Sequence, residues 1–366
     1  MKNILVSVFL LSAVPFSPPS ANKPAGPAPP PATSENLFII TIDGFRWQEV
    51  FTGADSALLC NENYTADPEY MKMLYWADDP EERRKRLLPF FWNILAVKGQ
   101  LYGNRHFDNR FNNANVYSIS YPGYNEIFTG MADLGISSND KNRNPNLNVL
   151  EYLNDQPSFK GKVAAFSSWD VFPYILNQER NHLLINSGYM QEHSTHSPEQ
   201  QMISDVQEKA VYEKTATRYD ELTFLTAKEY IKEHRPRVAF IGLGETDEFA
   251  HQGRYDLYLE QAAKTDKMIA ELWHWVQTTP GYRNNTTFLI TTDHGRGSKR
   301  SGWSSHGSFI KGSSQTWMAL IGPGINALGE VKEDQQYYQS QLAQTIAALL
   351  GEEFVNTGIA PAISLR

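Results

Sequence analysis

Cysteine is nearly absent from this sequence of 366 residues, which contains only Cys60. A single cysteine excludes an internal disulfide and any metal cluster held by several thiolates. Cys60 also lies far beyond the N-terminal segment, where a lipid-anchoring cysteine would be found. Any metal site in this chain must therefore use nitrogen and oxygen ligands.

Positive charge is also in short supply. The chain has 33 Lys and Arg residues against 41 Asp and Glu residues, which gives a formal net charge of −8 and a pI near 5.6. No basic stripe offsets this excess, so a nucleic-acid polymer is excluded as the main partner. The densest charge run, residues 81–86, mixes both signs and is typical of a solvated helix face.

Long hydrophobic runs are missing as well. Residues 4–11 are apolar and follow Lys2, but this run is too short to span a bilayer and is typical of a signal peptide. We expect the signal peptide at residues 1–21 and a Pro-rich tether at residues 22–35. No later segment has the apolar length of a membrane span. The sequence therefore predicts an exported protein, periplasmic or extracellular, with no span in the mature chain.

What the chain does contain is a repeated arrangement of an apolar run that ends in polar residues. Four such runs occur, at residues 37–42, 162–166, 238–244 and 287–292. They are followed by Asp43, by Ser167 to Asp170, by Glu245 and Asp247, and by Asp293 with His294. The carboxyl ends of parallel strands converge on one crevice, where ligands bind. The four runs therefore predict one site.

Helical periodicity separates these runs. It is clearest at residues 80–97, 200–234, 256–276 and 342–350. Residues 47–59 and 104–115 lack a period and are predicted as loops, and residues 170–178 and 181–188 are predicted as irregular. The alternation predicts an α/β fold with a mostly parallel sheet, in a single catalytic domain at residues 36–366 with inserts near 52–95 and 170–235.

Metal-ligand residue types gather after two of the strands. Asp247 and His251 are one helical turn apart and can face the same ion. Asp293 and His294 are adjacent and can share an ion only if the backbone bends at the following glycine. His306 lies in a glycine-punctuated loop. Singly, a strand-end Asp is usually a helix cap and a loop His is usually solvated; the repeated pattern favours a metal site.

Ser120 is the candidate nucleophile. Pro122 and Gly123 are predicted to break a short strand just after Ser120, and residues 124–128 can start a helix. A hydroxyl at such a transition lies near backbone N–H groups without partners. The alternative is an ordinary turn or cap serine. The sequence offers no obvious Ser-His-Asp triad.

Taken in chain order, these motifs resemble the alkaline phosphatase superfamily, and are most like its nucleotide pyrophosphatase/phosphodiesterase branch. The resemblance covers residues 36–351 and implies a three-layer αβα sandwich with a mostly parallel central sheet. The motifs that carry it are Asp43-Gly44, Ser120-Tyr121-Pro122, Asp247-x-x-x-His251, Asp293-His294-Gly295 and His306-Gly307.

The resemblance also implies two divalent metal ions and a covalent phosphoserine intermediate. Nitrogen and oxygen ligands suit zinc, with manganese as an alternative. One ion would be held by Asp247, His251 and His306, and the other by Asp43, Asp293 and His294, with Ser120 coordinating the second ion as the nucleophile.

The predicted substrate class depends on which charged residues follow the central strand. Monoesterases of this superfamily often place Lys-Asp-Arg after a central strand, whereas this chain has Ser168-Trp169-Asp170, which favours diesters. Arg46, Lys299 and Arg300 are the cations available to replace that charge. We expect substrate contacts from Arg46, Asn125 and Trp169. The asparagine that binds the phosphoryl oxygen in diesterases has four candidates: Asn112, Asn113, Asn115 and Asn125.

The sequence therefore predicts a metal-dependent phosphoric-ester hydrolase, with a small-molecule or head-group phosphodiester as substrate. A phosphomonoesterase on the same scaffold is the first alternative. A sulfatase is less favoured, because the Ser-x-Pro-x-Arg pattern of that branch has Tyr124 in place of Arg. A non-catalytic metal-containing protein that binds glycan or phospholipid head groups is the last alternative. The sequence gives no indication of oligomeric state.

Overall fold

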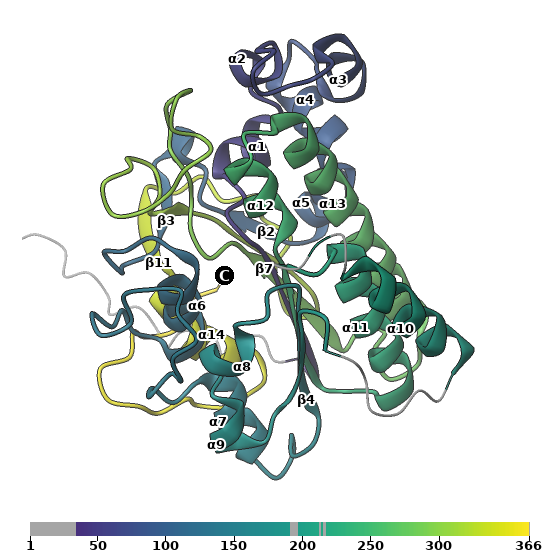
Figure 1. Cartoon of the computed structure of the whole chain (residues 1–366). Coiled ribbons are helices and arrows are strands. Elements are labelled where there is room, and N and C mark those ends of the chain that lie inside the picture. Colours follow the sequence, from purple (N-terminus) through teal and green to yellow (C-terminus); the bar gives the residue numbers. More distant parts are fainter. Residues whose placement is uncertain (1–33, 191–196, 212–213, 215–216, 366) are drawn as a thin grey trace, which may run out of the picture. The chain divides into compact units, whose positions relative to one another are not determined.

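An eight-stranded sheet forms the centre of the structure (Figure 1), in the order β10-β2-β9-β7-β1-β6-β4-β5. Neighbours from β7 to β5 are parallel, and β9 is antiparallel to both β7 and β2. The strands are β1 (Asn36–Ile42), β2 (Gln100–Tyr102), β4 (Val163–Ser167), β5 (Leu184–Ser187), β6 (Val238–Leu243), β7 (Thr286–Thr291), β9 (Met318–Ile321) and β10 (Gly329–Glu330).

This computed structural model describes residues 34–190, 197–211, 214 and 217–365. The predicted signal peptide and most of the predicted Pro-rich tether lie outside the described residues. Within them, every helix falls short of the length or the apolar character needed to cross a membrane.

Helices cover both faces of the sheet, because alternate residues of the buried strands point to opposite sides. In β1, Leu37 and Ile39 join the core on one face, whereas Phe38 and Ile40 join the core on the other. The first face is covered by α6 (Ser120–Thr129), α7 (Val149–Asp155), α8 (Phe172–Ile175) and α14 (Leu342–Leu349). The second is covered by α11 (Asp220–His234), α12 (Glu245–His251) and α13 (Tyr255–Thr278). The predicted three-layer αβα fold is confirmed.

The helices with a clear period also lie where the sequence places them. The predicted helix at residues 256–276 is α13, and its periodic positions Leu259, Ile269 and Leu272 are fully buried against the sheet. The region predicted as helical at residues 200–234 divides into α10 (Pro198–Ala210) and α11. Helix α10 begins with a capping box, formed by Ser197 and Gln200.

Three segments predicted as loops or irregular contain regular structure, so those predictions were wrong. Residues 47–59 form α1 (Trp47–Thr52) and α2 (Ser56–Leu59). Residues 104–115 contain a 3-10 helix (Arg105–Phe107) and β3 (Asn109–Asn112). Residues 170–188 contain α8, α9 (Gln178–Asn181) and β5.

These short elements depend on contacts that have no sequence period. Helix α2 is held by its cap, because the Asp55 side chain accepts hydrogen bonds from Ala57 N and Leu58 N. Strand β3 pairs with β8 (Gln315–Thr316) and β11 (Gln335–Tyr338), which are more than 200 residues away in the chain. The insert after α2 adds α3 (Pro68–Tyr75), α4 (Pro80–Leu87), a π-helix (Phe91–Leu95) and α5 (Ala96–Lys98).

A buried carboxyl group fixes part of this insert to the core. Asp266, on α13, accepts hydrogen bonds from Phe90 N at 2.8 Å and Phe91 N at 3.0 Å. Its side chain is almost fully buried, and burial raises the pKa of Asp266 to about 7. In the folded protein the carboxyl group therefore keeps its proton to a much higher pH than it does in the unfolded chain.

We expect this carboxyl group to make the stability depend on pH. Between the ordinary carboxyl pKa of 3.8 and about 7, the folded state holds a proton that the unfolded state has lost, so stability falls as pH rises through this window. Asp266→Asn stays neutral. The free energy of unfolding of the variant, relative to wild type, should therefore rise by roughly a few kcal/mol from pH 5 to pH 8 in urea titrations. The exposed control Asp334→Asn should show no such change, and a pH-independent difference for Asp266→Asn would contradict the assignment.

Candidate metal centre

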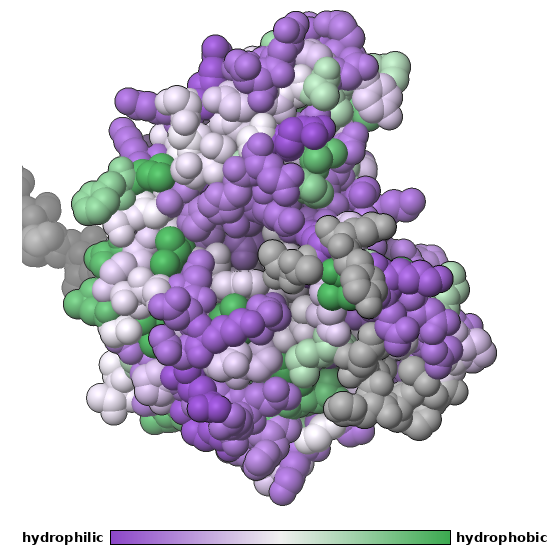
Figure 2. All heavy atoms as spheres, viewed as in Figure 1, coloured by the Kyte–Doolittle hydropathy of each residue, from purple (hydrophilic) through white to green (hydrophobic). Residues whose placement is uncertain are grey.

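The six predicted ligands come together at the carboxyl ends of three neighbouring strands, β7, β1 and β6. Figure 2 shows this face hollowed between α6 and α12 and lined by hydrophilic side chains. Two ligands follow β7, one follows β1, and two lie on α12 after β6. The sixth comes from the loop that follows β7. The predicted ligands are Asp43, Asp247, His251, Asp293, His294 and His306.

Asp43, Asp293 and His294 form the first group. His294 Nε2 lies 3.4 Å from both Asp43 Oδ1 and Asp293 Oδ2. The other oxygen of each carboxylate accepts a hydrogen bond, from Tyr124 OH at 3.2 Å and from Gly44 N at 3.1 Å respectively. Asp43 Oδ1 and Asp293 Oδ2 are buried and have no hydrogen-bond partner among the described residues. Two unpartnered carboxylate oxygens beside an imidazole nitrogen form a cradle that fits a cation.

Asp247, His251 and His306 form the second group. His251 Nε2 lies 3.1 Å from Asp247 Oδ2 and 3.0 Å from His306 Nε2. A tetrahedral zinc ion separates its nitrogen ligands by roughly 3.3 Å, so this spacing is suitable. His294 also approaches this group, with its Nε2 3.9 Å from Asp247 Oδ1, and Asp247, His294 and His306 each bring one donor atom within 4.8 Å of the others. His251 stays the predicted third ligand, because its Nε2 is closer to Asp247, and His294 is the alternative.

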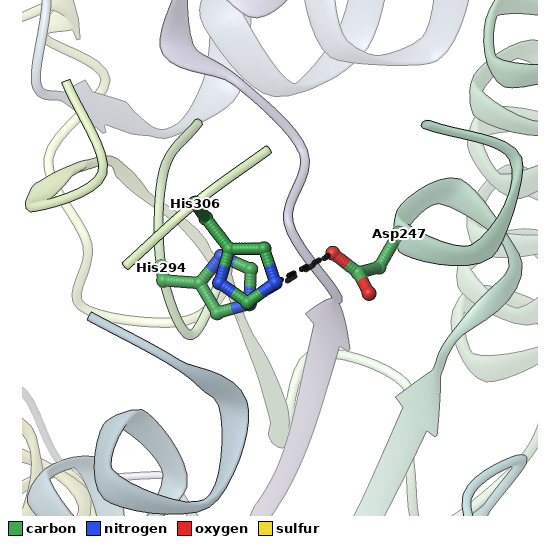
Figure 3. A group of neighbouring side chains, drawn as sticks. All are labelled: Asp247, His294 and His306. Atoms are coloured by element: carbon green, nitrogen blue, oxygen red, sulfur yellow. Dashed lines mark ion pairs between the residues drawn. The ribbon is translucent and has the colours of Figure 1, made fainter. Parts of the chain in front are cut away.

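The imidazoles present the correct nitrogen to both groups. His294 Nδ1 lies 2.9 Å from Gly295 O, and His306 Nδ1 lies 3.0 Å from Ser118 O. A carbonyl oxygen only accepts, so each Nδ1 must carry the proton and each Nε2 must hold the lone pair in the neutral ring. Figure 3 shows the two rings overlapping, with the carboxylate of Asp247 approaching from α12.

Burial is the largest cause of the pKa shifts of these groups. Burial, together with Asp293 and Asp247, raises the pKa of Asp43 well above its usual range, and burial raises the pKa of Asp293 to about 7. Burial lowers the pKa of His306 to about 4 and, with the nearby His306, holds the pKa of His294 well below its usual range. A divalent cation would favour the deprotonated form of both residue types. The donor set therefore fits a metal ion.

Arg296 is a residue of this centre that the sequence reasoning missed. Its guanidinium contacts Asp247 Oδ1 and donates hydrogen bonds to Trp303 O at 3.0 Å and Ser304 O at 2.5 Å. Burial alone would raise the pKa of Asp247, but Arg296 and the hydrogen bond with His251 outweigh it and hold that pKa well below its usual range. The one sequence feature that could have identified Arg296 is its position two residues after His294.

Ser120 is the first residue of α6, so the predicted short strand before it is wrong. Its Oγ lies 3.3 Å from His294 Nε2, beside the first group. The helix can approach closely because a Cβ on Gly123 would lie only 2.5 Å from Asp293 O. Tyr124, one turn beyond Ser120, donates to Asp43. One helix thus carries the hydroxyl and supports a ligand.

Two of the three predicted substrate-binding residues, Arg46 and Asn125, lie away from the ligand groups. The buried guanidinium of Arg46 is paired with Glu49. The buried carboxamide of Asn125 forms hydrogen bonds with Met131, Asn144 and Asn146. The structure brings neither of them to the ligand groups. Trp169 is half-buried, just beyond the carboxyl end of β4.

Asn139 is a second residue that the sequence reasoning missed. Its Oδ1 accepts a hydrogen bond from Tyr121 N at 2.9 Å, next to Ser120. The side chain is exposed. Two residues further, Lys141 forms an ion pair of 2.7 Å with Asp170. Nothing in the local sequence distinguishes Asn139 from the other asparagines of its loop.

A mostly parallel αβα sheet with acidic and imidazole groups at its carboxyl edge is the arrangement that the alkaline phosphatase superfamily implies. The family model described as Sulfatase matches residues 57–352, so the chain belongs to that family and is a hydrolase of the alkaline phosphatase superfamily. No curated protein sequence was found to match.

Solved structures share the fold. Wild-type alkaline phosphatase PafA has a TM-score of 0.59 at 11% identity, over 91% of this chain and 98% of that chain. Lipoteichoic acid synthase LtaP from Listeria monocytogenes has a TM-score of 0.54 at 13% identity, over 90% and 74%. A putative sulfatase from Bacteroides thetaiotaomicron has a TM-score of 0.56 at 12% identity, over 90% and 73%. Identities this low support the fold and leave the substrate open.

We expect removal and return of zinc to change the stability of the protein. A ligand that binds only the folded state stabilises it, so saturating Zn²⁺ added to chelator-treated protein should raise Tm by about 5 °C or more. Asp293→Asn should raise, or leave unchanged, the Tm in chelator, because the amide removes the charge of a buried carboxylate whose Oδ2 has no hydrogen-bond partner among the described residues. The same variant should bind one zinc ion fewer per chain, measured by elemental analysis.

Asp334→Asn serves as the matched control, because Asp334 is an exposed aspartate outside the ligand groups. It should leave both Tm values and the zinc content unchanged. Wild-type zinc content in Asp293→Asn would show that this carboxylate is not a ligand.

Proposed function

We propose that the protein is an exported, two-metal phosphoric-ester hydrolase that cleaves phosphodiesters through a phosphoserine at Ser120. The observation that carries this proposal is the 3.3 Å separation of Ser120 Oγ and His294 Nε2, next to the unpartnered oxygens of Asp43 and Asp293. A purely structural metal site needs no hydroxyl beside its ligands. The proposal also includes export directed by a signal peptide at residues 1–21, and a single catalytic domain at residues 36–366.

Serine is a weak nucleophile near neutral pH, so its hydroxyl needs activation. Bound divalent ions, zinc or manganese, would lower the pKa of this hydroxyl and offset the charge of the phosphoryl oxygens. The chain itself fixes the geometry. Helix α6 holds Ser120 at its first position, Tyr124 orients Asp43, and Gly295 O orients His294.

The reaction then follows from the position of Ser120. Its Oγ forms a bond to phosphorus while the bond to the leaving group breaks, and the proton of the Ser120 hydroxyl goes to the leaving oxygen, which departs as the alcohol. Water next attacks phosphorus, the bond to Oγ breaks, and one proton of the water restores the Ser120 hydroxyl while a phosphate monoester is released. We assign the phosphoryl-binding asparagine to Asn139. Its Oδ1 is held by Tyr121 N, so its amide N–H groups are the part of this exposed side chain that is able to donate to a phosphoryl oxygen.

Charge favours a diester over a monoester. A monoester dianion brings one more negative charge than a diester, and two cations near the candidate site already have carboxylate partners. These pairs are Lys141 with Asp170 and Arg296 with Asp247. Neither cation is free to neutralise the additional charge of a dianion. The phosphatase PafA keeps the monoesterase alternative open, and Tyr124, which stands where the sulfatase pattern has Arg, argues against sulfate esters.

We expect Ser120→Ala to lower kcat/KM for an activated aryl phosphodiester by on the order of 10⁴-fold, because the nucleophile is lost. Zinc content should stay at the wild-type value, and Ser120→Thr should retain part of the activity. Ser158→Ala, a change of an exposed serine outside the ligand groups, should have no effect. Mass spectrometry of acid-quenched wild type should show a phosphate on Ser120.

The same assay with an aryl monoester and an aryl sulfate separates the alternatives. Faster monoester turnover would replace the diesterase proposal by a phosphomonoesterase, and faster sulfate turnover would replace it by a sulfatase. Full zinc content with no turnover of any of the three would favour the non-catalytic alternative.

Asn139→Ala should lower kcat/KM for the diester by roughly 10- to 100-fold, because one hydrogen bond to the phosphoryl group is lost in the transition state. Inhibition by vanadate should weaken in parallel, since vanadate presents similar oxygens. Asn142→Ala, an exposed asparagine of the same loop, is the matched control. Equal vanadate inhibition of Asn139→Ala and wild type would remove Asn139 from the site.

A further inference from the structure

The loop at residues 297–312, which carries His306, has a charge opposite to that of the chain. It contains three basic residues and no acidic residue, in a protein of net charge −8. All three basic side chains are exposed, and none forms an ion pair within the part of the chain that the structure describes. They are Lys299, Arg300 and Lys311.

The two large aromatic residues of this loop have opposite environments. Trp303 is fully buried, with its ring 5.1 Å from that of Tyr255 and 5.7 Å from that of Tyr258. Phe309 is exposed as fully as in an extended peptide, at 103%. The loop is not loose, because Ser298 N donates to Lys311 O at 3.0 Å. An anchored loop therefore presents a phenyl ring to solvent three residues from His306.

Two neighbouring loops also expose apolar side chains. Val116 is 58% exposed and Leu134 is 70% exposed. Tyr117 OH donates to Leu134 O at 2.7 Å, and Ser118 O accepts from His306, so the three loops are hydrogen-bonded to one another around the candidate site. In Figure 2, separate hydrophobic side chains lie among hydrophilic ones on the side of the hollow where α6 is found.

We propose that this rim docks on an anionic lipid bilayer, and that the phosphate ester cleaved at Ser120 is carried by a lipid head group. The rim comprises Val116, Leu134 and Phe309 with Lys299, Arg300 and Lys311. Separate apolar side chains insert into the acyl boundary while unpaired cations meet anionic head groups. A protein partner fits less well, because lysine is depleted from protein interfaces. The choice of substrate rests on the proposed function, whereas the docking does not.

Vesicle co-sedimentation of the full mature chain tests the docking. We expect binding to vesicles of phosphatidylcholine mixed with phosphatidylglycerol, weaker binding at high salt, and little binding to phosphatidylcholine alone. Phe309→Ser should lower the affinity at least about tenfold, because a phenyl ring is no longer buried. Lys299→Ser, Arg300→Ser and Lys311→Ser should each lower it roughly fivefold.

Val355→Ser is the matched control, because Val355 is 70% exposed and lies outside these loops. Equal vesicle binding by wild type and Phe309→Ser would overturn the docking proposal. So would concentration-dependent dimerisation, in sedimentation velocity, that Phe309→Ser abolishes, since the rim would then bind a second copy of the chain.

Measuring the rate of diester cleavage in solution and on vesicles tests the docking proposal separately from the proposed function. Phe309→Ser should cleave a soluble aryl diester at the wild-type rate and should cleave a head-group diester in anionic vesicles at least about tenfold more slowly. Wild type that binds vesicles but cleaves no diester would refute the diesterase and leave the docking in place. An equal rate on vesicles for both proteins would overturn the lipid-substrate inference.

Discussion

Asp43 and Asp293 each turn one buried carboxylate oxygen toward His294, and no described residue donates a hydrogen bond to either of these two oxygens. The arrangement follows from the sheet: β1 and β7 are parallel neighbours with Thr41 opposite Thr291, so the residues two positions further along lie side by side. Bringing two like charges together without water costs several kcal/mol. Folding therefore creates the charge imbalance that cation binding relieves, and metal affinity and fold stability become linked.

The second ligand group depends on contacts from the insert between β4 and β6. Asp220, fully buried at the start of α11, accepts hydrogen bonds from Gly244 N at 2.7 Å and Glu245 N at 3.0 Å. These are backbone groups at the start of α12, the helix that carries Asp247 and His251. The insert thus holds α12, the helix that carries two of the predicted ligands, in place.

The sequence allowed prediction of the features that depend on local pattern. Apolar strands and amphipathic helices have a period, and a parallel sheet brings strand ends together, so the meeting of Asp43, Asp247 and Asp293 was predictable. Strand β3 was missed because its partners are distant in the chain, and Asn139 was missed because only the fold places it beside Tyr121. Arg46 and Asn125 have suitable polar groups, yet those groups are taken by neighbouring residues.

Membership of the Sulfatase family leaves the chemistry to be decided by individual residues. Tyr124 stands where the sulfatase pattern has Arg, and its hydroxyl donates to Asp43. The exchange removes a positive charge near the proposed nucleophile Ser120, and the Tyr124 hydroxyl on the same helix orients Asp43, a predicted ligand. Arg296, the buried cation of the centre, is already matched by Asp247. Because this cation is already paired, the centre has less capacity to stabilise a dianion, and this is the physical reason for proposing an ester with a single negative charge as the substrate.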